Sequence, residues 1–383
     1  MALAWGVDER LWWLLWAPAP GLGVGALRQL EGEFGSLQAA WEAPPEALQA
    51  MQGFGPARLR AIGQHRARWG ADPLAAWRAA GQRGLGQLLP GDPAMPAAIA
   101  ALQRPPLVLH WRGRGSLWAP LRRRQAVAVV GTRRASAHGL AMAETIGVAL
   151  ARAGWPVVSG LAEGIDAAVH RGCLRAGGRP VAVLGTALER VYPSHHQLLQ
   201  QQVGRSGLLI SEQPPGTAVL AGHFAARNRL QVALAGALVL VECPERSGAL
   251  HSAHLARELG LPVWVVPADA GKRSAAGSNA FLARGVAALL APDHLVRALG
   301  PGPLARAASV GVASLGAPPQ QAPAPSPGSP AAQAVMAAVG SGASLLQLSQ
   351  QLGQASAELL LQLLALELAG LLQAEPGLCW RPA

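Results

Sequence analysis

Six short apolar runs recur through the middle of this sequence, separated by helix-length stretches. The runs are AVAVV (126–130), PVVSG (156–160), PVAVLG (180–185), GLLIS (207–211), ALVLVE (237–242) and PVWVVP (262–267). Runs this short and apolar are typical of strands buried on both faces and joined in parallel by helices. The pattern predicts an α/β fold with a parallel, doubly wound sheet. Ligands in such folds bind beyond the carboxyl ends of the strands, so we expect functional residues there.

The segment before these runs has a helical pattern and two glycine turns. Gly21–Gly25 and Gly53–Pro56 are each followed by a short helical stretch. Turns of this form occur in a helix-hairpin-helix, whose backbone N–H groups can hold a phosphate. Two ordinary turns in a small helical bundle are the alternative.

The segment after the runs begins with a proline-rich stretch and returns to helical periodicity. Three helical patterns and a closing QAEPGLCWRPA, which could form a β wing, predict a winged-helix-like module. We therefore expect a helical domain at 1–120, the sheet domain at 121–300, a linker at 301–330 and the winged-helix-like domain at 331–383.

Positive charge is concentrated in the predicted sheet domain. The chain carries 32 Lys and Arg against 21 Asp and Glu, a formal net charge of +11. Residues 121–300 hold 19 of the basic and 10 of the acidic residues, net +9, whereas residues 301–383 are net −1. This surplus favours a polyanionic partner that contacts the middle of the chain rather than its tail.

Cysteine content and the lengths of apolar runs indicate the compartment. Three widely spaced cysteines, Cys173, Cys243 and Cys379, fit neither a disulfide framework nor a four-ligand zinc site. No run reaches the ~18 apolar residues that a membrane-spanning helix needs. We expect a cytoplasmic protein that does not contact a membrane.

The first predicted strand ends in a candidate anion-binding loop. Gly131 allows a tight turn, Thr132 and Ser136 supply hydroxyls before the next helix, and Arg133 adds a cation. A plain strand-to-helix turn is the alternative.

The second predicted strand ends in Gly160 and Gly164, which again open a helix. Asp166 and His170 are four residues apart and lie on one helix face. They could form an acid/base pair. We favour structural support, in which Asp166 fixes the loop and His170 bonds backbone beneath the site, because no nucleophile accompanies them.

The segment after the fourth strand combines an aromatic ring with basic and amide side chains. Phe224, Arg227, Asn228 and Arg229 lie within six residues at a predicted helix start. Arginines neutralise phosphates, and stacking on an aromatic ring contributes ~1–3 kcal/mol per base in single-strand binding. An ion-paired helix start with a core phenylalanine is the alternative.

Other strand ends add supporting residues. Ser247 and Gly248 start the helix after the fifth strand and could contact a phosphate, and Lys272 lies in a basic loop after the sixth. Tyr192, the only tyrosine, either stacks on a base or closes its loop by packing. Glu212 ends the fourth strand and is expected to support the site.

No catalytic constellation is evident in the sequence. It contains no hydrolase triad, no metal-ligand set and no Walker P-loop, and His251 and His254 lack a third ligand. We expect a binding protein with no cofactor, no metal and no catalytic turnover.

The blocks of residues described above resemble the DprA/Smf family, the DNA-processing proteins of natural transformation. The matching blocks, in order within about residues 125–298, are GTRRAS, SGLAEGIDAAVH, VYP, LLISEQPPG, FAARNR, VECPERSGAL, SAAGSN and ARGVA. The resemblance implies an extended Rossmann-like fold that binds single-stranded DNA, forms a homodimer and loads RecA onto the strand. It also suggests single-stranded DNA-binding protein as a partner.

The resemblance implies roles for residues at matching positions. The phosphate-binding pocket would contain Gly131, Arg133 and Ser136, and its floor would be shaped by Gly160, Gly164, Asp166 and His170. Bases and phosphates would contact Phe224, Arg227, Asn228 and Arg229, and a helix N-terminus would carry Ser247 and Gly248. The sequence departs from the family at Ala225, where proline is usual, and this change bears on local hydrogen bonding.

Two other functions are alternatives, a nucleotide phosphoribohydrolase and an interaction scaffold. Rossmann-like nucleotide phosphoribohydrolases carry a Pro-Gly-Gly-x-Gly-Thr-x-x-Glu motif at a strand end. The nearest segment, residues 244–252, lacks the Gly-Gly pair and the glutamate. A scaffold for other transformation proteins is the second, and the net +9 sheet domain indicates DNA binding in addition.

Overall fold

A nine-stranded sheet organises the larger part of the computed structural model, which describes residues 5–79, 85–305, 330–354, 356–375 and 379–383. Its strand order is β1-β2-β6-β5-β4-β3-β7-β8-β9. The strands are β1 Gly86–Leu88, β2 Leu109–Gly113, β3 Val127–Val130, β4 Val157–Ser159, β5 Pro180–Leu184, β6 Leu208–Ser211, β7 Ala237–Leu240, β8 Val263–Val265 and β9 Ala287–Ala288. The pairs β1–β2 and β2–β6 are antiparallel, and all other neighbours in this sheet are parallel.

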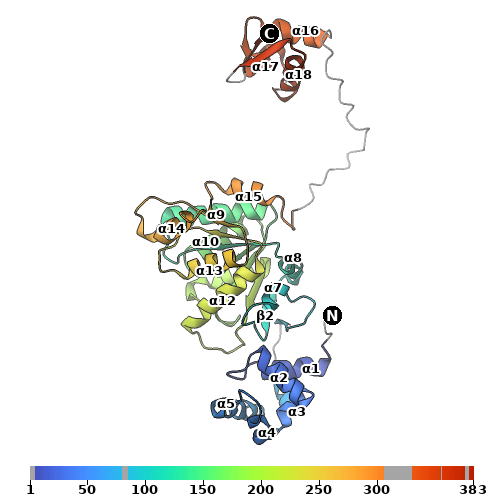
Figure 1. The fold of residues 1–383 in the computed structure, drawn as a ribbon, viewed down its shortest axis with the longest axis vertical. Helices are drawn as coiled ribbons and strands as arrows, with labels where there is room; N and C mark the ends of the chain where they lie inside the picture. Colours follow the sequence, from blue (N-terminus) through green and yellow to red (C-terminus); the bar gives the residue numbers. More distant parts are fainter. Residues whose placement is uncertain (1–4, 80–84, 306–329, 355, 376–378) are drawn as a thin grey trace. The chain divides into compact units, whose positions relative to one another are not determined.

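The six strands expected from the apolar runs are β3 to β8, and their parallel pairing is confirmed. Helices cover both faces of the sheet (Figure 1). Val127 and Val129 pack with α9 and α10, whereas Ala128 and Val130 pack with α12 and α13. Both faces are buried, which is why each run is apolar throughout rather than alternating. The helices are α9 Ala137–Arg152, α10 Ile165–Arg175, α11 Gln197–Ser206, α12 Ala221–Leu234, α13 Gly248–Glu258, α14 Ala276–Leu282 and α15 Pro292–Leu299.

Three strands of the nine-stranded sheet were not predicted, namely β1, β2 and β9. Each is short or carries polar and small residues, as in LHWRG of β2, so no apolar run marks it. β1 and β2 precede residue 121, so the sheet extends into the segment expected to be helical. The end of a separate domain at residue 120 stays a prediction.

The first described residues form six helices around a tryptophan-rich core. They are α1 Val7–Trp16, α2 Val24–Phe34, α3 Leu37–Glu42, α4 Pro45–Gln49, α5 Pro56–Ala67 and α6 Pro73–Ala79. Trp13 and Trp16 are fully buried with Leu27, Leu30 and Ile62. Two short helices, α7 Ala97–Ala100 and α8 Trp118–Arg122, flank β2 in the chain. A helix-hairpin-helix identity for this region stays a prediction.

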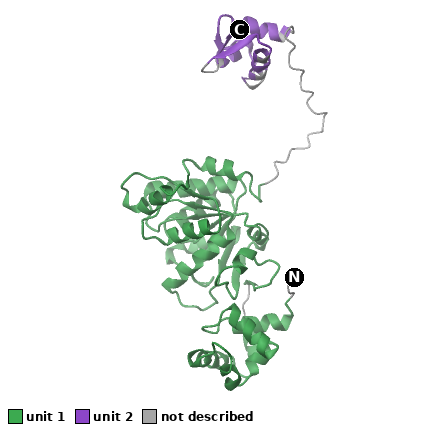
Figure 2. Cartoon of the chain, in the orientation of Figure 1, with its two compact units in different colours: residues 1–306 green, residues 307–383 purple. Residues whose placement is uncertain are grey.

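The chain divides into two compact units, residues 1–306 and 307–383 (Figure 2). The second unit contains α16 Pro330–Val339, β10 Ala343–Ser344, α17 Leu345–Leu352, α18 Ser356–Leu368, β11 Leu372–Glu375 and β12 Cys379–Pro382. Its strands pair antiparallel in the order β10-β12-β11, over a core that includes Val335, Leu348 and Trp380. Most of the expected linker, residues 306–329, lies outside the described residues. Within the described ranges, no helix is both long and apolar enough to cross a membrane.

Candidate nucleic-acid interface

A cavity lies beyond the carboxyl ends of β3 and β7, two adjacent strands of the sheet. β3 has β4 on its other side, so the chain winds in one direction from β3 to β6 and in the opposite direction from β7 onward. Such a switch point leaves a crevice between the loops that follow the two strands. The volume of this β3–β7 cavity is about 420 Å³.

Nine of the residues selected from the sequence line the β3–β7 cavity. They are Gly131, Thr132, Arg133, Asp166, Phe224, Arg227, Asn228, Ser247 and Gly248. Phe224, Arg227, Asn228 and Gln231 all reach it from α12 because i, i+3, i+4 and i+7 share one helix face. Sequence reasoning missed Gln231, which this periodicity could have found, and also Arg134 and Arg246, which adjoin selected residues.

The wall of the cavity contains a buried ion pair. Arg227 is 4% exposed, and its Nη1 donates to the Val183 carbonyl at 2.8 Å while its Nη2 lies 3.6 Å from Asp166 Oδ2. The Gly160 N–H donates to the same carboxylate oxygen at 3.2 Å, so Asp166 does fix the loop after β4. Burial raises the pKa of Asp166 and lowers that of Arg227, and each charge opposes the shift of the other.

Gly160 makes room for this pair. A Cβ at Gly160 would lie 1.5 Å from Arg227 Nη1, so the guanidinium rests directly on the glycine backbone. The structure therefore places Arg227 in the wall of the site, already paired, rather than free at its surface.

His170 lies beneath the site and is fully buried. Neither ring nitrogen has a hydrogen-bond partner among the described residues, so the expected bond to backbone is not seen there. Burial, with the charge of Arg227 and then His196, lowers the pKa of His170 to about 3. The ring is therefore neutral near pH 7 and unsuited to act as a base.

We expect this neutral histidine to make stability depend on pH. In the unfolded chain a histidine titrates near 6.5, so acid protonates the unfolded state first and stability falls between pH 6.5 and about 3. The loss from His170 reaches ~2 kcal/mol by pH 5. Urea unfolding at pH 7 and pH 5 should show that His170→Leu loses ~2 kcal/mol less than the parent chain. Equal losses in the two proteins would contradict this assignment.

The start of α9 already holds an anion, the Glu242 carboxylate. Ser136 Oγ donates to Glu242 Oε2 at 2.7 Å, and Lys272 Nζ donates to Ser136 Oγ at 2.8 Å. Glu242 is 2% exposed and lies 3.8 Å from the same Nζ. Burial alone would raise the pKa of Glu242, but hydrogen bonds from Ser274 and Ser136 and the Lys272 charge bring it below its usual value. The position expected for a phosphate near Ser136 is thus occupied by a side chain that sequence reasoning overlooked.

An aromatic pair and an exposed arginine form the rim of the cavity. The Phe224 and Tyr192 rings lie 4.9 Å apart between centroids at 45°, and Arg133 Cζ lies 5.5 Å from the Phe224 centroid. Tyr192 packs on Phe224 yet stays 45% exposed, so packing and base stacking are both compatible with its position. Arg133 and Phe224 line the β3–β7 cavity, and Tyr192 borders it by packing on Phe224. With Gly160 and Glu163, the three residues line an adjoining niche of about 60 Å³, which we call the aromatic niche.

The start of α13 closes the opposite side of the cavity. Ser247 caps this helix by accepting from the Ala249 N–H at 3.2 Å. Asn228 Nδ2 donates to the Gly248 carbonyl at 3.4 Å, which ties α12 to α13. The exposed side chain of Arg246 adds a cation beside this helix start.

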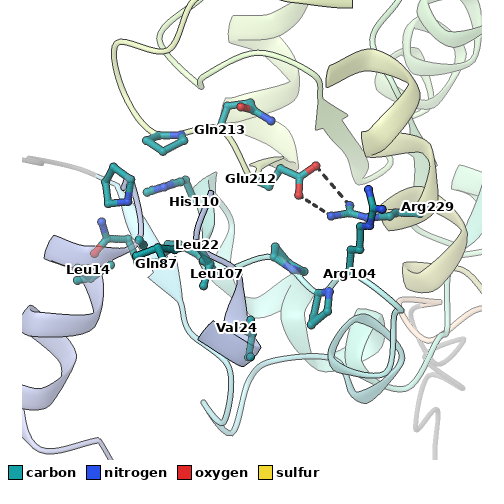
Figure 3. Close-up of a pocket in the computed structure, with 18 of the residues that line it drawn as sticks. Leu14, Leu22, Val24, Gln87, Arg104, Leu107, His110, Glu212, Gln213 and Arg229 are labelled. Atoms are coloured by element: carbon teal, nitrogen blue, oxygen red, sulfur yellow. Dashed lines mark hydrogen bonds and ion pairs between the residues drawn. The ribbon is translucent and has the colours of Figure 1, made fainter. Parts of the chain in front are cut away.

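Arg229 and Glu212 lie away from the β3–β7 cavity. Figure 3 shows them facing each other in a second cavity, of about 580 Å³, with Arg104 beside them. Arg229 Nη2 donates to Glu212 Oε2 at 2.6 Å. Arg229 follows Asn228 directly and so points some 100° away from it around the helix. The structure therefore does not bring this predicted contact to the β3–β7 cavity.

The sequence and the fold are both similar to those of known proteins. Residues 87–300 match the family model described as DNA recombination-mediator protein A. Protein Smf from Synechocystis is 36% identical over 298 residues, which cover 78% of this chain and 74% of that protein. The chain belongs to the DprA/Smf family. DNA processing protein DprA from Bacillus subtilis is 30% identical over 226 residues, 59% of this chain and 74% of that protein.

Solved structures of the family share the fold. DNA processing protein A from Streptococcus pneumoniae superposes with a TM-score of 0.61 at 22% identity, covering 77% of this chain and 98% of that one. DNA processing protein A from Helicobacter pylori superposes with a TM-score of 0.50 at 27% identity, covering 56% of this chain and 95% of that one. The latter structure was described for its single-stranded DNA binding mode.

Proposed function

We propose that this protein binds single-stranded DNA in the β3–β7 cavity. The observation that supports this most directly is the rim, where Arg133 lies over Phe224 and Phe224 packs on the half-exposed Tyr192. An arginine joined to stacked aromatic rings suits an unpaired base and its phosphate together. The single-stranded DNA binding of the Helicobacter pylori relative supports the same function.

Different residues would perform different parts of this binding. The exposed arginines Arg133, Arg134 and Arg246 would neutralise phosphates, and the aromatic pair would stack on bases. Arg227, held by Asp166, would keep the wall in shape rather than contact the strand. Duplex DNA buries its base faces in the stack, so this rim selects an unpaired strand.

Loss of two exposed arginines from the β3–β7 cavity should weaken binding and reduce its salt dependence. We expect Arg133→Gln with Arg246→Gln to lower affinity for oligo-dT at least about tenfold, because charged hydrogen bonds to phosphate are lost. The slope of log affinity against log salt should fall by ~1.4, at ~0.7 per phosphate contact. Gel shifts over a salt series, with single- and double-stranded oligonucleotides, measure both quantities.

A matched control removes the same charge elsewhere. Arg152 and Arg205 are exposed in the last turns of α9 and α11, toward the amino ends of the parallel strands and away from the cavity. Arg152→Gln with Arg205→Gln should leave affinity and slope nearly unchanged. Equal losses in the two double variants, or a preference of the parent chain for duplex, would overturn the proposed site.

Membership of the family supports a proposal for the wider role. We propose that the bound strand is passed to RecA during natural transformation, in the cytoplasm, by a homodimer. Residues 331–383, with a helical core and the β11–β12 hairpin, are proposed to be a winged-helix domain that contacts protein rather than DNA, because residues 301–383 are net −1. A single-stranded DNA-binding protein is a further proposed partner.

We propose that binding occurs without catalytic turnover. The segment after β7 lacks the Gly-Gly pair and the glutamate of the phosphoribohydrolase motif. Glu242, which precedes this segment, is 2% exposed and accepts a hydrogen bond from Ser136. Release of base from a nucleoside monophosphate by the purified protein would revive that alternative.

A further inference from the structure

An open groove adjoins the β3–β7 cavity and is distinct from the cavity that contains Arg229 and Glu212. It has a volume of about 570 Å³ and lies between the β3–α9 loop, the first turns of α10 and the helix α11. We call it the arginine groove, since Arg133, Arg134 and Arg171 line it. Arg133 and Arg134 also line the β3–β7 cavity, and Arg133 lines the aromatic niche as well. The three hollows therefore meet at Arg133.

The cations of the arginine groove are not neutralised by the protein. All three arginines are exposed, and none of them forms an ion pair with a carboxylate among the described residues. Among the described residues, the acidic side chain that lines the groove is Glu163, whose Oε1 lies 3.5 Å from His195 Nε2. The Arg171 charge also acts on the far wall of the groove: burial lowers the pKa of His196, a hydrogen bond with the Leu161 carbonyl opposes this shift, and the Arg171 charge adds to it.

A neighbouring arginine on the same helix behaves differently. Arg175 lies one turn after Arg171 on α10, and its Nη1 pairs with Glu144 Oε1 at 2.6 Å. Arg175 is therefore neutralised by a carboxylate, whereas Arg171 forms no ion pair among the described residues. Arg171 lines the groove, and Arg175 does not.

We propose that the arginine groove holds the phosphate backbone of the strand where it continues beyond the β3–β7 cavity, with Arg171 as a phosphate contact. This inference rests on the proposed function, because it extends the path of the same strand. Three cations along one groove need a partner with regularly repeated negative charge, which a phosphodiester chain provides. Leu198 is 73% exposed on the groove wall and offers an apolar surface to a base.

The test compares Arg171→Gln with Arg175→Gln on oligo-dT of increasing length. We expect the parent chain to gain affinity once the oligonucleotide is long enough to reach the groove. Arg171→Gln should lose this gain, with affinity for the longer strands ~3–10-fold lower and the salt slope lower by ~0.7, while the shortest strand that binds is unaffected. Arg175→Gln should match the parent chain at every length.

A substitution of opposite sign completes the test. Glu163→Gln removes the acidic side chain that lines the arginine groove and should tighten binding of the longer strands. Equal behaviour of Arg171→Gln and Arg175→Gln, or an equal loss for short and long strands in Arg171→Gln, would overturn the groove. An effect of Arg171→Gln on binding of an acidic peptide but not of DNA would identify a protein surface instead and also overturn it.

Failure of the proposed function would look different. In that case the parent chain itself would bind no strand of any length in dilute buffer. Thermal unfolding of each variant separates a lost contact from a lost fold, and substitution of exposed arginines should shift stability by no more than ~1 kcal/mol.

Discussion

Replacing Asp166 with alanine is expected to lower the free energy of unfolding by ~3–5 kcal/mol, because it leaves the Arg227 guanidinium buried without its counter-charge. Arg227 is only 4% exposed and lies 3.6 Å from the carboxylate, so water cannot take over the lost interaction. Urea unfolding at pH 7 measures the change. Affinity for oligo-dT should fall as well, since this pair forms the cavity wall.

Two further variants separate charge from shape. Asp166→Asn keeps the acceptor for the Gly160 N–H but removes the charge, and it should lose most of the same stability. Arg227→Met in the Asp166→Ala background should recover part of the loss, because the stranded charge is gone. Additive losses in the double variant would show that the pair is not coupled.

Replacing Gly164 with alanine is expected to lower stability by ~2–6 kcal/mol, from ~1–3 kcal/mol of backbone strain and ~1–3 kcal/mol of overpacking. Gly164 has a φ of 75°, and a Cβ there would lie 2.3 Å from the Thr132 carbonyl oxygen and 2.6 Å from that of Arg133. Both contacts are backbone atoms of the loop that carries the rim arginine. Strand affinity should therefore fall together with the melting temperature.

Gly177 provides the matched control for the steric clash that a Cβ at Gly164 would make. Its φ is 69°, but a Cβ there would meet nothing within 4 Å. Gly177→Ala should lose only the cost of the left-handed backbone, ~1–2 kcal/mol, and leave DNA binding intact. Equal losses of stability in Gly164→Ala and Gly177→Ala would mean that the contact between the new Cβ and the loop after β3 does not contribute to the destabilisation.

Several features of the site were predictable from local sequence. The carboxyl-end loops after β3, β4 and β7 do meet where the parallel sheet requires, since strand direction alone brings these ends to one edge. The α12 face that reaches the cavity follows the helical period from Phe224 to Gln231. The same period could have shown that Arg229 points elsewhere.

Other features depended on contacts between residues far apart in the chain. β1 and β2 join the sheet through antiparallel pairing with β6, although neither carries an apolar run that would mark a buried strand. Glu242 accepts a hydrogen bond from Ser136 at the start of α9, 106 positions away in the sequence, and no local residue spacing predicts this contact.

By itself the sequence determined the parallel strands and the edge of the sheet at which a ligand would bind, because burial on both faces demands apolar runs that are visible locally. Only the tertiary structure decided which cations remain free at that edge. Arg227 is held by Asp166, Arg229 by Glu212 and Lys272 by Glu242. Arg133, Arg134 and Arg246 stay exposed there, because electrostatic pairing follows distance in space rather than distance along the chain.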